Sequence, residues 1–370
     1  MVTCMTALSG YDRIIVKVGS ALLVQDGKLR NEWLNRLCHD IATLKAKNID
    51  VLIVSSGAIA LGRQVLNMGS GSLTLPQKQA CAAAGQSGLT RAYDLALSAY
   101  GLQSAQALLT LDDTENRRKW LNARATIGTL LSLDVIPIIN ENDTVATAEI
   151  RYGDNDRLAA RTAQMVEADL LILLSDIDGL YTADPRLDTT AQHVPVVEKL
   201  SNEITAMGGP PNIQTGLGSG GMATKLMAAR IAMNAGCDMI ICDGRPEGAL
   251  GALGNGTRHT LFKASENPGR ARAQWISGSL SPAGKLHIDQ GAASALKNGR
   301  SLLAVGLTSV SGSFGKGDTV SILDPHGGEI ARGLCSYDSR DIESLCGLTT
   351  EQIDHPSGAV VVHRDNLVLT

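Results

Sequence analysis

Three glycine-bearing turns in this chain contain residues that could handle a phosphate group. They span residues 17–20 (KVGS), 55–58 (SSGA) and 216–225 (GLGSGGMATK). Glycine lets backbone N–H groups approach phosphate oxygens closely, and the start of a helix adds partial positive charge. Lys17 and Lys225 would add full positive charges from opposite ends of the same region. Together the turns indicate phosphate chemistry.

Two common phosphate-binding motifs do not account for these turns. The chain contains no G-x-x-x-x-G-K-[ST] sequence, so it is not a P-loop enzyme. Residues 216–221 do satisfy G-x-G-x-x-G, and Asp243 lies at a suitable distance beyond them to contact a ribose. A dinucleotide site requires a strand directly before the glycines, however, and residues 208–212 (GGPPN) are a poor strand sequence. This pattern disfavours a dinucleotide site.

Asparagine and acidic residues are concentrated at 140–143 (NEND) and 154–156 (DND). One interpretation is a hairpin whose last three residues, 154–156, cap a helix beginning at Arg157. Two such clusters exceed what one helix cap requires. Carboxylates accept hydrogen bonds from an ammonium group, and amides donate them to a carboxylate, so the set suits a zwitterion. An amino-acid substrate, which carries both an ammonium and a carboxylate group, fits this set of side chains.

The elements that would position these residues alternate along the chain up to about residue 262. Strands are expected over 13–18, 50–54, 105–110, 135–140, 169–174 and 238–242, and helices over 31–47, 77–100, 115–131, 157–167 and 222–235. Most of the strands are continuously apolar, which is typical of strands covered on both faces. The pattern predicts a three-layer α/β/α sandwich with a mainly parallel sheet. Ligands of such sheets bind beyond the carboxyl ends of the strands, where the glycine turns are expected.

The composition changes after residue 264. Residues 265–270 (SENPGR) read as a linker, and short strands are expected beyond it at 275–279, 285–288, 319–323, 329–334 and 359–363. We therefore predict a catalytic domain over 1–264, a linker over 265–272 and a small β-rich domain over 273–370. Beyond residue 270 the chain carries eight basic against ten acidic side chains, so this part is not a basic module.

Bulk properties exclude several classes of protein. The formal net charge of −4 gives no reason to expect tight binding to nucleic acid or to an anionic membrane. The first ten residues do not resemble a signal peptide, and no apolar run approaches the ~20 residues that span a bilayer. The seven cysteines form no C-x-x-C pair and favour buried free thiols over a metal site. We expect a cytoplasmic protein.

Six segments of the chain resemble the signature segments of the glutamate 5-kinase family, in that family's order and spacing. They are IVKVGS, VSSGAIALG, INENDTVATAEI, GDNDRLAA, LLSDIDGLYTADPR and GLGSGGMATKLMAA. The resemblance covers residues from about 13 to 262, and the C-terminal part resembles the PUA domain of many bacterial members. It implies the amino acid kinase fold and ATP-dependent phosphorylation of the L-glutamate side-chain carboxylate, the first step of proline biosynthesis.

The resemblance also implies roles for individual residues. The catalytic set would be Lys17 and Lys225, which contact the transferred phosphoryl group, and Asp156, which orients both lysines. Glutamate would be held by Ser56, Asp143 and Asn155. The nucleotide would be bound by Lys17, Ser175, Asp176, Ser219, Gly220, Gly221, Met222, Ala223, Thr224 and Lys225. Mg²⁺ would accompany ATP, with no protein side chain assigned to it.

Two positions depart from the family pattern. Arg151 stands where lysine is frequent, and a guanidinium does not simply replace a point-charge ammonium. Ser175 stands where threonine is frequent, a change that keeps the hydroxyl.

The resemblance further implies feedback inhibition by proline, a homo-oligomer (dimer or tetramer) and delivery of the product to glutamate 5-phosphate reductase. Three alternatives stay open from the sequence: an amino acid kinase that acts on another carboxylate, an RNA-associated PUA protein, and a non-catalytic amino-acid sensor. The charge balance and sparse aromatic residues of the C-terminal part argue against the RNA alternative. Retention of both lysines argues against a sensor.

Overall fold

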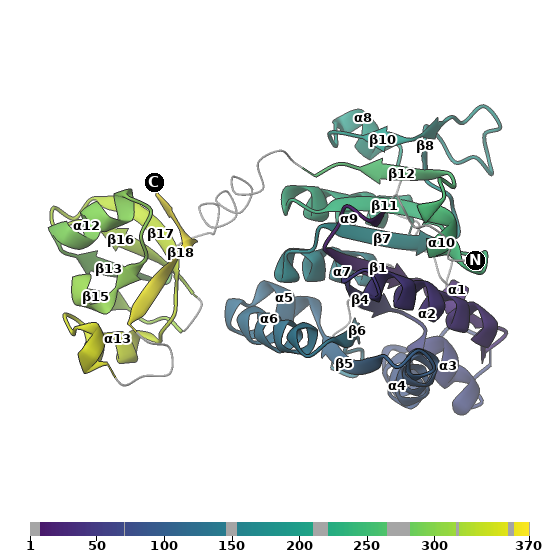
Figure 1. The fold of residues 1–370 in the computed structure, drawn as a ribbon, viewed down its shortest axis with the longest axis horizontal. Coiled ribbons are helices and arrows are strands. Elements are labelled where there is room, and N and C mark those ends of the chain that lie inside the picture. The colour runs from purple at the N-terminus through teal and green to yellow at the C-terminus, as the bar shows by residue number, and fades with distance from the viewer. Residues whose placement is uncertain are drawn as a thin grey trace. The chain divides into compact units, whose positions relative to one another are not determined.

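A computed structural model describes residues 8–69, 71–145, 154–209, 221–264, 282–315, 318–353 and 359–369. The chain divides into two compact units, with the boundary near residue 268 (Figure 1). Each unit has its own sheet and its own core.

The larger unit is built on an eight-stranded sheet. In spatial order its strands are β10 (Val196–Val197), β12 (His259–Phe262), β11 (Asp238–Asp243), β7 (Leu170–Ser175), β1 (Arg13–Val18), β4 (Asp50–Ser55), β6 (Val135–Glu141) and β5 (Gln103–Leu109). The six strands from β11 to β5 run parallel, whereas β12 is antiparallel to β11. The sheet is mainly parallel, as the sequence predicts.

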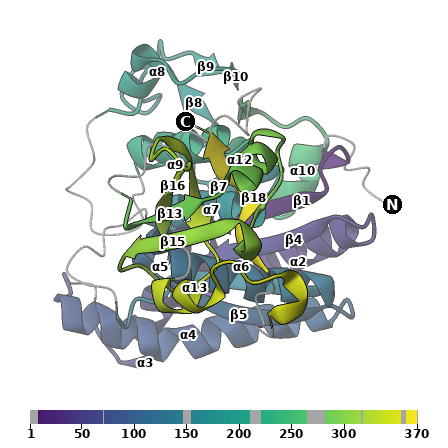
Figure 2. The ribbon, with the colours of Figure 1, turned by 90° about the vertical axis from the view of Figure 1, so that its left-hand side faces the viewer.

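The helices of the larger unit cover both faces of this sheet and connect its strands. They are α1 (Ser20–Leu23), α2 (Asn31–Lys45), α3 (Ala58–Val65), α4 (Leu75–Ser98), α5 (Leu111–Glu115), α6 (Arg117–Ser132), α7 (Asp154–Val166), α8 (Asn202–Ala206), α9 (Met222–Asn234) and α10 (Ala249–Gly254). Two short hairpins, β2 (Val24–Gln25) with β3 (Lys28–Leu29) and β8 (Leu180–Tyr181) with β9 (His193–Val194), complete the unit. Helix α8 and the β8–β9 hairpin lie beyond the β10 end of the sheet (Figure 2).

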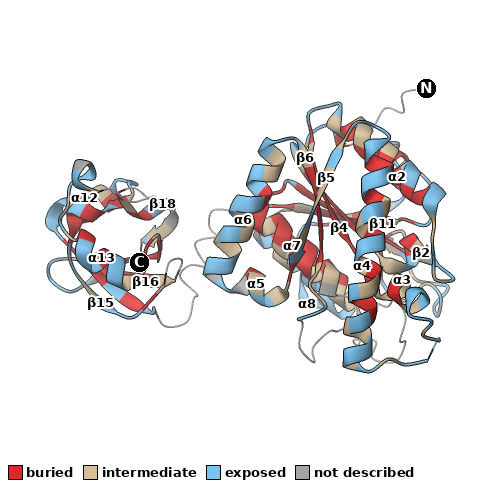
Figure 3. Ribbon diagram, turned by 90° about the horizontal axis from the view of Figure 1, so that it is seen from below, coloured by how far each residue is buried: buried red, intermediate tan, exposed pale blue. Residues whose placement is uncertain are grey.

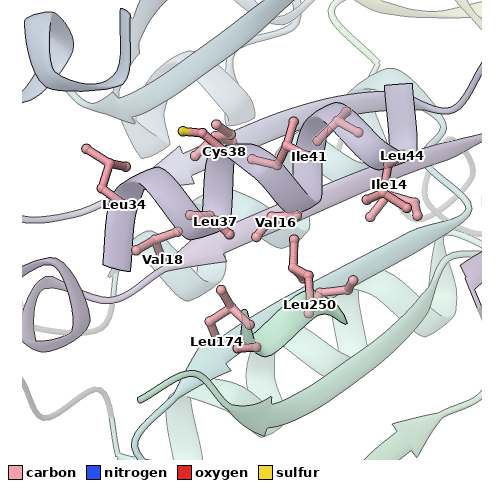
Figure 4. Close-up of a cluster of buried hydrophobic side chains, with 14 of the residues drawn as sticks. Ile14, Val16, Val18, Leu34, Leu37, Cys38, Ile41, Leu44, Leu174 and Leu250 are labelled. Atoms are coloured by element: carbon pink, nitrogen blue, oxygen red, sulfur yellow. The ribbon is translucent and has the colours of Figure 1, made fainter. Parts of the chain in front are cut away.

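One face of the sheet packs against α2, α4 and α10. Figure 4 shows the apolar stripe of α2, from Leu34 to Leu44, lying on Ile14, Val16 and Val18 of β1. Successive residues of a strand point to opposite faces, so Ile15 and Lys17 point to the other face, where α7 packs on β1. Figure 3 shows the strands buried and the helices exposed on their outer sides. This alternation places the Lys17 side chain on the face of the sheet that α7 covers.

Helices α3 and α4 cross at very short range because both carry a glycine at the crossing. A Cβ added to Gly62 would lie 1.7 Å from the carbonyl oxygen of Cys81, and one added to Gly85 would lie 2.0 Å from that of Ala58. Gly57, the residue before α3, has φ +118°, a backbone conformation that favours glycine. Gly57 thus allows α3 to begin at the last residue of the second glycine turn, and Gly62 and Gly85 let α3 lie close to α4.

The smaller unit contains a six-stranded sheet, consistent with the β-rich domain that the sequence predicts. In spatial order the strands are β14 (Leu302–Leu303), β18 (Val360–Leu369), β17 (Glu329–Cys335), β16 (Thr319–Leu323), β13 (Gly284–Ile288) and β15 (Leu307–Gly312). Helices α12 (Gln290–Lys297) and α13 (Ser339–Leu345) pack with it around a separate core that includes Phe314 and Tyr337. The strand expected at 275–279 lies outside the described residues.

One sequence prediction needs correction, and several short helices were not predicted. The helix expected from Arg157 begins at Asp154, so residues 154–156 form its first turn and do not precede it. The helix expected over 115–131 corresponds to α6 (Arg117–Ser132), and α5 (Leu111–Glu115) is a separate short helix before it. Among the described helices, those not predicted are α1, α3, α5, α8, α10, α12 and α13. None of the helices in the described parts of the chain is long and apolar enough to cross a membrane.

Candidate active site

The carboxyl ends of five parallel strands meet at one edge of the sheet. Val18 of β1 pairs with Ser55 of β4 on one side and with Leu174 of β7 on the other. In the same way Ser175 pairs with Asp243 of β11, and β4 pairs with β6 up to Ile139. This register brings the first two glycine turns and the end of β6, which contains the first two residues of the NEND segment, to the same edge.

Asp156, in the first turn of α7, lies between two lysines that come from distant parts of the sequence. Lys17 Nζ is 2.6 Å from Asp156 Oδ1, and Lys225 Nζ is 3.0 Å from Asp156 Oδ2. The carboxylate is fully buried, and the two lysines are only 7% and 6% exposed. Each oxygen of the carboxylate therefore faces one ammonium group, and the two cations are brought together by a single anion.

The electrostatics of this cluster follow from burial and from the pairing. Burial alone would raise the pKa of Asp156, but the ammonium groups of Lys17 and Lys225 together outweigh it and hold the pKa below its usual range. Burial lowers the pKa of Lys17, an effect that Asp156 opposes. The cluster thus pairs one carboxylate with two lysine side chains, and all three side chains are buried.

Asn155, the residue before Asp156, joins three other elements. Its amide nitrogen donates to Ser56 Oγ at 2.6 Å, to Asn140 Oδ1 at 3.1 Å and to the carbonyl oxygen of Ser55 at 3.2 Å. Asn140 in turn donates to Gln86 Oε1 of α4 at 2.7 Å. Within the described residues the amide oxygen of Asn155 is buried without a hydrogen-bond partner. The network connects the end of β4, the end of β6 and the start of α7.

Of the residues expected at the nucleotide, Ser175 lies at the end of β7 with Asp176 directly after it, and Gly221 to Lys225 lie at the start of α9. Ser175 Oγ donates to Asp176 Oδ1 at 3.2 Å. Helix α9 begins at Met222 after Gly221, and Thr224 Oγ1 lies 3.5 Å from Asp156 Oδ2. The partial positive charge at the start of this helix adds to the positive charge of the Lys225 side chain, and both favour an anionic ligand.

The structure describes only one of the remaining candidate residues. Asp143 lies in the turn that follows β6, three residues beyond Asn140, and is half-buried. Ser219, Gly220 and Arg151 lie outside the described residues. The structure therefore brings together Lys17, Lys225 and Asp156 as one group, and Ser56 with Asn155 as a second.

Two residues of the network were not predicted. Gln86 lies in the middle of α4, where the sequence carries no signal that distinguishes it from other polar helix residues. Tyr93, seven residues later, is fully buried, and its hydroxyl lies 3.0 Å from Ser55 Oγ. The helical spacing of Tyr93 with Leu89 and Leu97 indicates a core face, and all three are buried. Its contact with the site could not be deduced from that spacing.

Comparisons with known proteins identify the family of this chain. A family model described as "Amino acid kinase family" matches residues 12–243, and one for the PUA domain matches residues 284–356. A glutamate 5-kinase of Rhizobium etli is 54% identical over 98% of this chain and 94% of its own length. One of Paracoccus denitrificans is 51% identical over 98% of both chains. The chain belongs to the glutamate 5-kinases of the amino acid kinase family.

Solved structures of isopentenyl phosphate kinases also match this amino acid kinase. The product complex from T. acidophilum has a TM-score of 0.45 and 12% identity over 68% of this chain and 100% of that chain. The family assignment rests on the family models and on the relatives named above.

Proposed function

We propose that this chain transfers the γ-phosphoryl group of ATP to the side-chain carboxylate of L-glutamate, giving L-glutamate 5-phosphate. The observation that carries the proposal is the convergence of Lys17 and Lys225 on buried Asp156, next to the Asn155–Ser56 pair. A pair of cations beside a cluster of amide and hydroxyl groups suits two anionic reactants. The names of the relatives at 51–54% identity support glutamate as the acceptor.

The reaction requires little proton chemistry. A glutamate side chain has a reference pKa of ~4.3, so the acceptor carboxylate is ionised at neutral pH and needs no general base. The enzyme must instead overcome the repulsion between this carboxylate and the polyphosphate. In our proposal Lys17 and Lys225 offset the negative charge of the transferred group, and Asp156 holds both ammonium groups in place. The start of α9 adds backbone N–H groups on the nucleotide side.

We assign Mg²⁺ to the substrate, as its complex with ATP. Among the described residues, no group of three or more His, Cys, Asp or Glu side chains could hold a metal ion. Asp156 is a poor candidate ligand because each of its oxygens faces a lysine. Mg²⁺ is commonly bound through substrate phosphates and few protein ligands, which fits this arrangement.

The further partners rest on the family resemblance. Feedback inhibition by proline, a homo-oligomer and a partner reductase belong to this proposal, as does a cytoplasmic location. The domain boundaries at 264 and 273 also stay a prediction.

A hydroxamate assay tests the acceptor. The full chain is incubated with Mg²⁺·ATP, hydroxylamine and either L-glutamate, L-aspartate or N-acetyl-L-glutamate, and ADP release is measured in parallel. We expect hydroxamate and ADP in equal amounts with L-glutamate and little of either with the other two acids. Preference for another acid would identify a different amino acid kinase, and no turnover with any acid would favour the sensor alternative.

A further inference from the structure

Helix α4 supports the candidate acceptor side of the site at two positions. Gln86 and Tyr93 are seven residues apart, which places them two turns apart on one face of the helix. Gln86 contacts Asn140 at the end of β6, and Tyr93 contacts Ser55 at the end of β4. The close crossing of α4 with α3 at Gly85 lies directly beside Gln86. Neither residue belongs to the set that the family resemblance implies.

The hydrogen bonds that begin at Gln86 have a fixed direction. The backbone N–H of Glu141 can only donate, and it donates to Asn140 Oδ1 at 2.9 Å. The other end of the Asn140 amide is therefore its NH₂ group, which donates to Gln86 Oε1. Gln86 thereby holds the plane of the Asn140 amide, and Asn140 Oδ1 stays turned towards Asn155.

The Asn155 amide is oriented by the same reasoning. Two of its three neighbours, the carbonyl oxygen of Ser55 and Asn140 Oδ1, accept hydrogen bonds, so its NH₂ group must face them. That group also donates to Ser56 Oγ at 2.6 Å. Because the Ser56 oxygen accepts this bond, the Ser56 proton is directed elsewhere. Ser56 is half-buried, so its hydroxyl can reach a ligand.

We propose that Gln86 is a positioning residue for the acceptor: through Asn140 and Asn155 it orients the Ser56 hydroxyl as a donor to a carboxylate oxygen of the amino-acid substrate. This inference rests on the proposed function and adds a residue and a direction of hydrogen bonding to it. Gln86 does not touch the substrate. Its loss changes how well the acceptor is bound and leaves the lysine pair in place.

The test compares two substitutions of Gln86 in the full chain. Gln86→Met keeps the length of the side chain but removes the acceptor for Asn140, and the KM for L-glutamate should rise about tenfold, the size expected when a partly buried donor loses its partner. The KM for ATP and kcat at saturating glutamate should change less than twofold. Gln86→Glu keeps an oxygen acceptor at the same distance and should restore most of the affinity.

Gln164→Met is the matched control. Gln164 is a half-buried glutamine of α7 whose amide oxygen accepts from Arg161 of the same helix at 3.2 Å, and its substitution should leave both KM values unchanged. Thermal unfolding confirms that each variant is folded. If Gln86→Met does not fold, Gln86→Asn, which withdraws the acceptor by one methylene, takes its place.

The results of these assays distinguish the positioning role of Gln86 from the proposed function of the chain. An unchanged KM for L-glutamate in Gln86→Met, or an equal rise in the KM for ATP, overturns the positioning role while the proposed function stands. A Gln86→Glu variant whose KM for L-glutamate rises as much as that of Gln86→Met also overturns the positioning role. If the unsubstituted chain does not phosphorylate L-glutamate, the proposed function fails, and the positioning role fails with it.

Discussion

Replacing Asp156 by Asn keeps the shape of the side chain and removes the charge that joins the two lysines. At an effective dielectric constant of about 20, charges 2.6–3.0 Å apart attract by roughly 6 kcal/mol for each pair. The burial of all three groups opposes this attraction, so the net cost of breaking such a buried pair is about 3–5 kcal/mol. For a unit of this size that loss lowers the Tm by roughly 10 °C.

Differential scanning calorimetry measures this effect. Asp156 lies in the larger unit, so we expect only that unit's transition to fall in Asp156→Asn, while the smaller unit's transition provides an internal reference. Asp184→Asn, which breaks the exposed ion pair with Arg186, should shift neither transition appreciably.

A double substitution separates lost charge balance from lost packing. Asp156→Asn leaves two ammonium groups facing each other in a buried site, and adding Lys17→Met removes one of them. The double variant should therefore unfold at a higher temperature than Asp156→Asn alone, although both should be inactive. Losses that simply add, or an Asp156→Asn transition within about 2 °C of the unsubstituted chain, would refute the view that this carboxylate holds the two cations together.

Three further results are expected. Lys225→Met should lower kcat by about 10²–10³-fold in the hydroxamate assay, with a smaller loss of Tm than Asp156→Asn because Asp156 keeps Lys17 as a partner; a near-normal kcat would rule out the proposed role. Although burial opposes the effect, the two lysines lower the pKa of Asp156, so its contribution to stability is present above about pH 4 and is lost as the pH falls towards its folded-state pKa. Calorimetry from pH 7 to pH 3 should therefore show the Tm gap between the unsubstituted chain and Asp156→Asn narrowing at acid pH, and a constant gap would contradict this. Gly85→Ala should lower the Tm strongly by forcing α3 from α4, whereas Gly88→Ala on the same helix meets no atom within 4 Å and should raise it slightly; equal effects would argue against the tight crossing.

The sequence predicts the parts of this fold that depend on strong local patterns. The continuous apolar runs of β1, β4 and β7 identify buried parallel strands, and the parallel order places their carboxyl ends at one edge. The expectation that Lys17 and Lys225 act at one site follows from that topology, and the structure brings both to Asp156. Their catalytic roles stay a prediction.

Features that depend on tertiary packing could not be predicted in this way. Helix α3 contains a glycine in its middle and is short, so its intrinsic signal is weak. It forms where Gly62 and Gly85 let two backbones meet. The direction of the amide network depends on which backbone groups lie beside Asn140 and Asn155, and no spacing in the sequence encodes this. The contribution of Gln86 is of the same kind.

The start of α7 connects the two halves of the proposed reaction. Asn155 and Asp156 are adjacent residues, yet their side chains serve different groups: Asn155 is hydrogen-bonded to Ser56 and Asn140, and Asp156 is paired with Lys17 and Lys225. Since one helical turn carries both, the spacing between the acceptor side and the lysine pair is set by covalent geometry and not by a flexible loop. A displacement of the first turn of α7 would disturb both sides together. Variants that loosen this turn should therefore lose glutamate affinity and turnover in parallel, whereas changes at Gln86 should affect affinity alone.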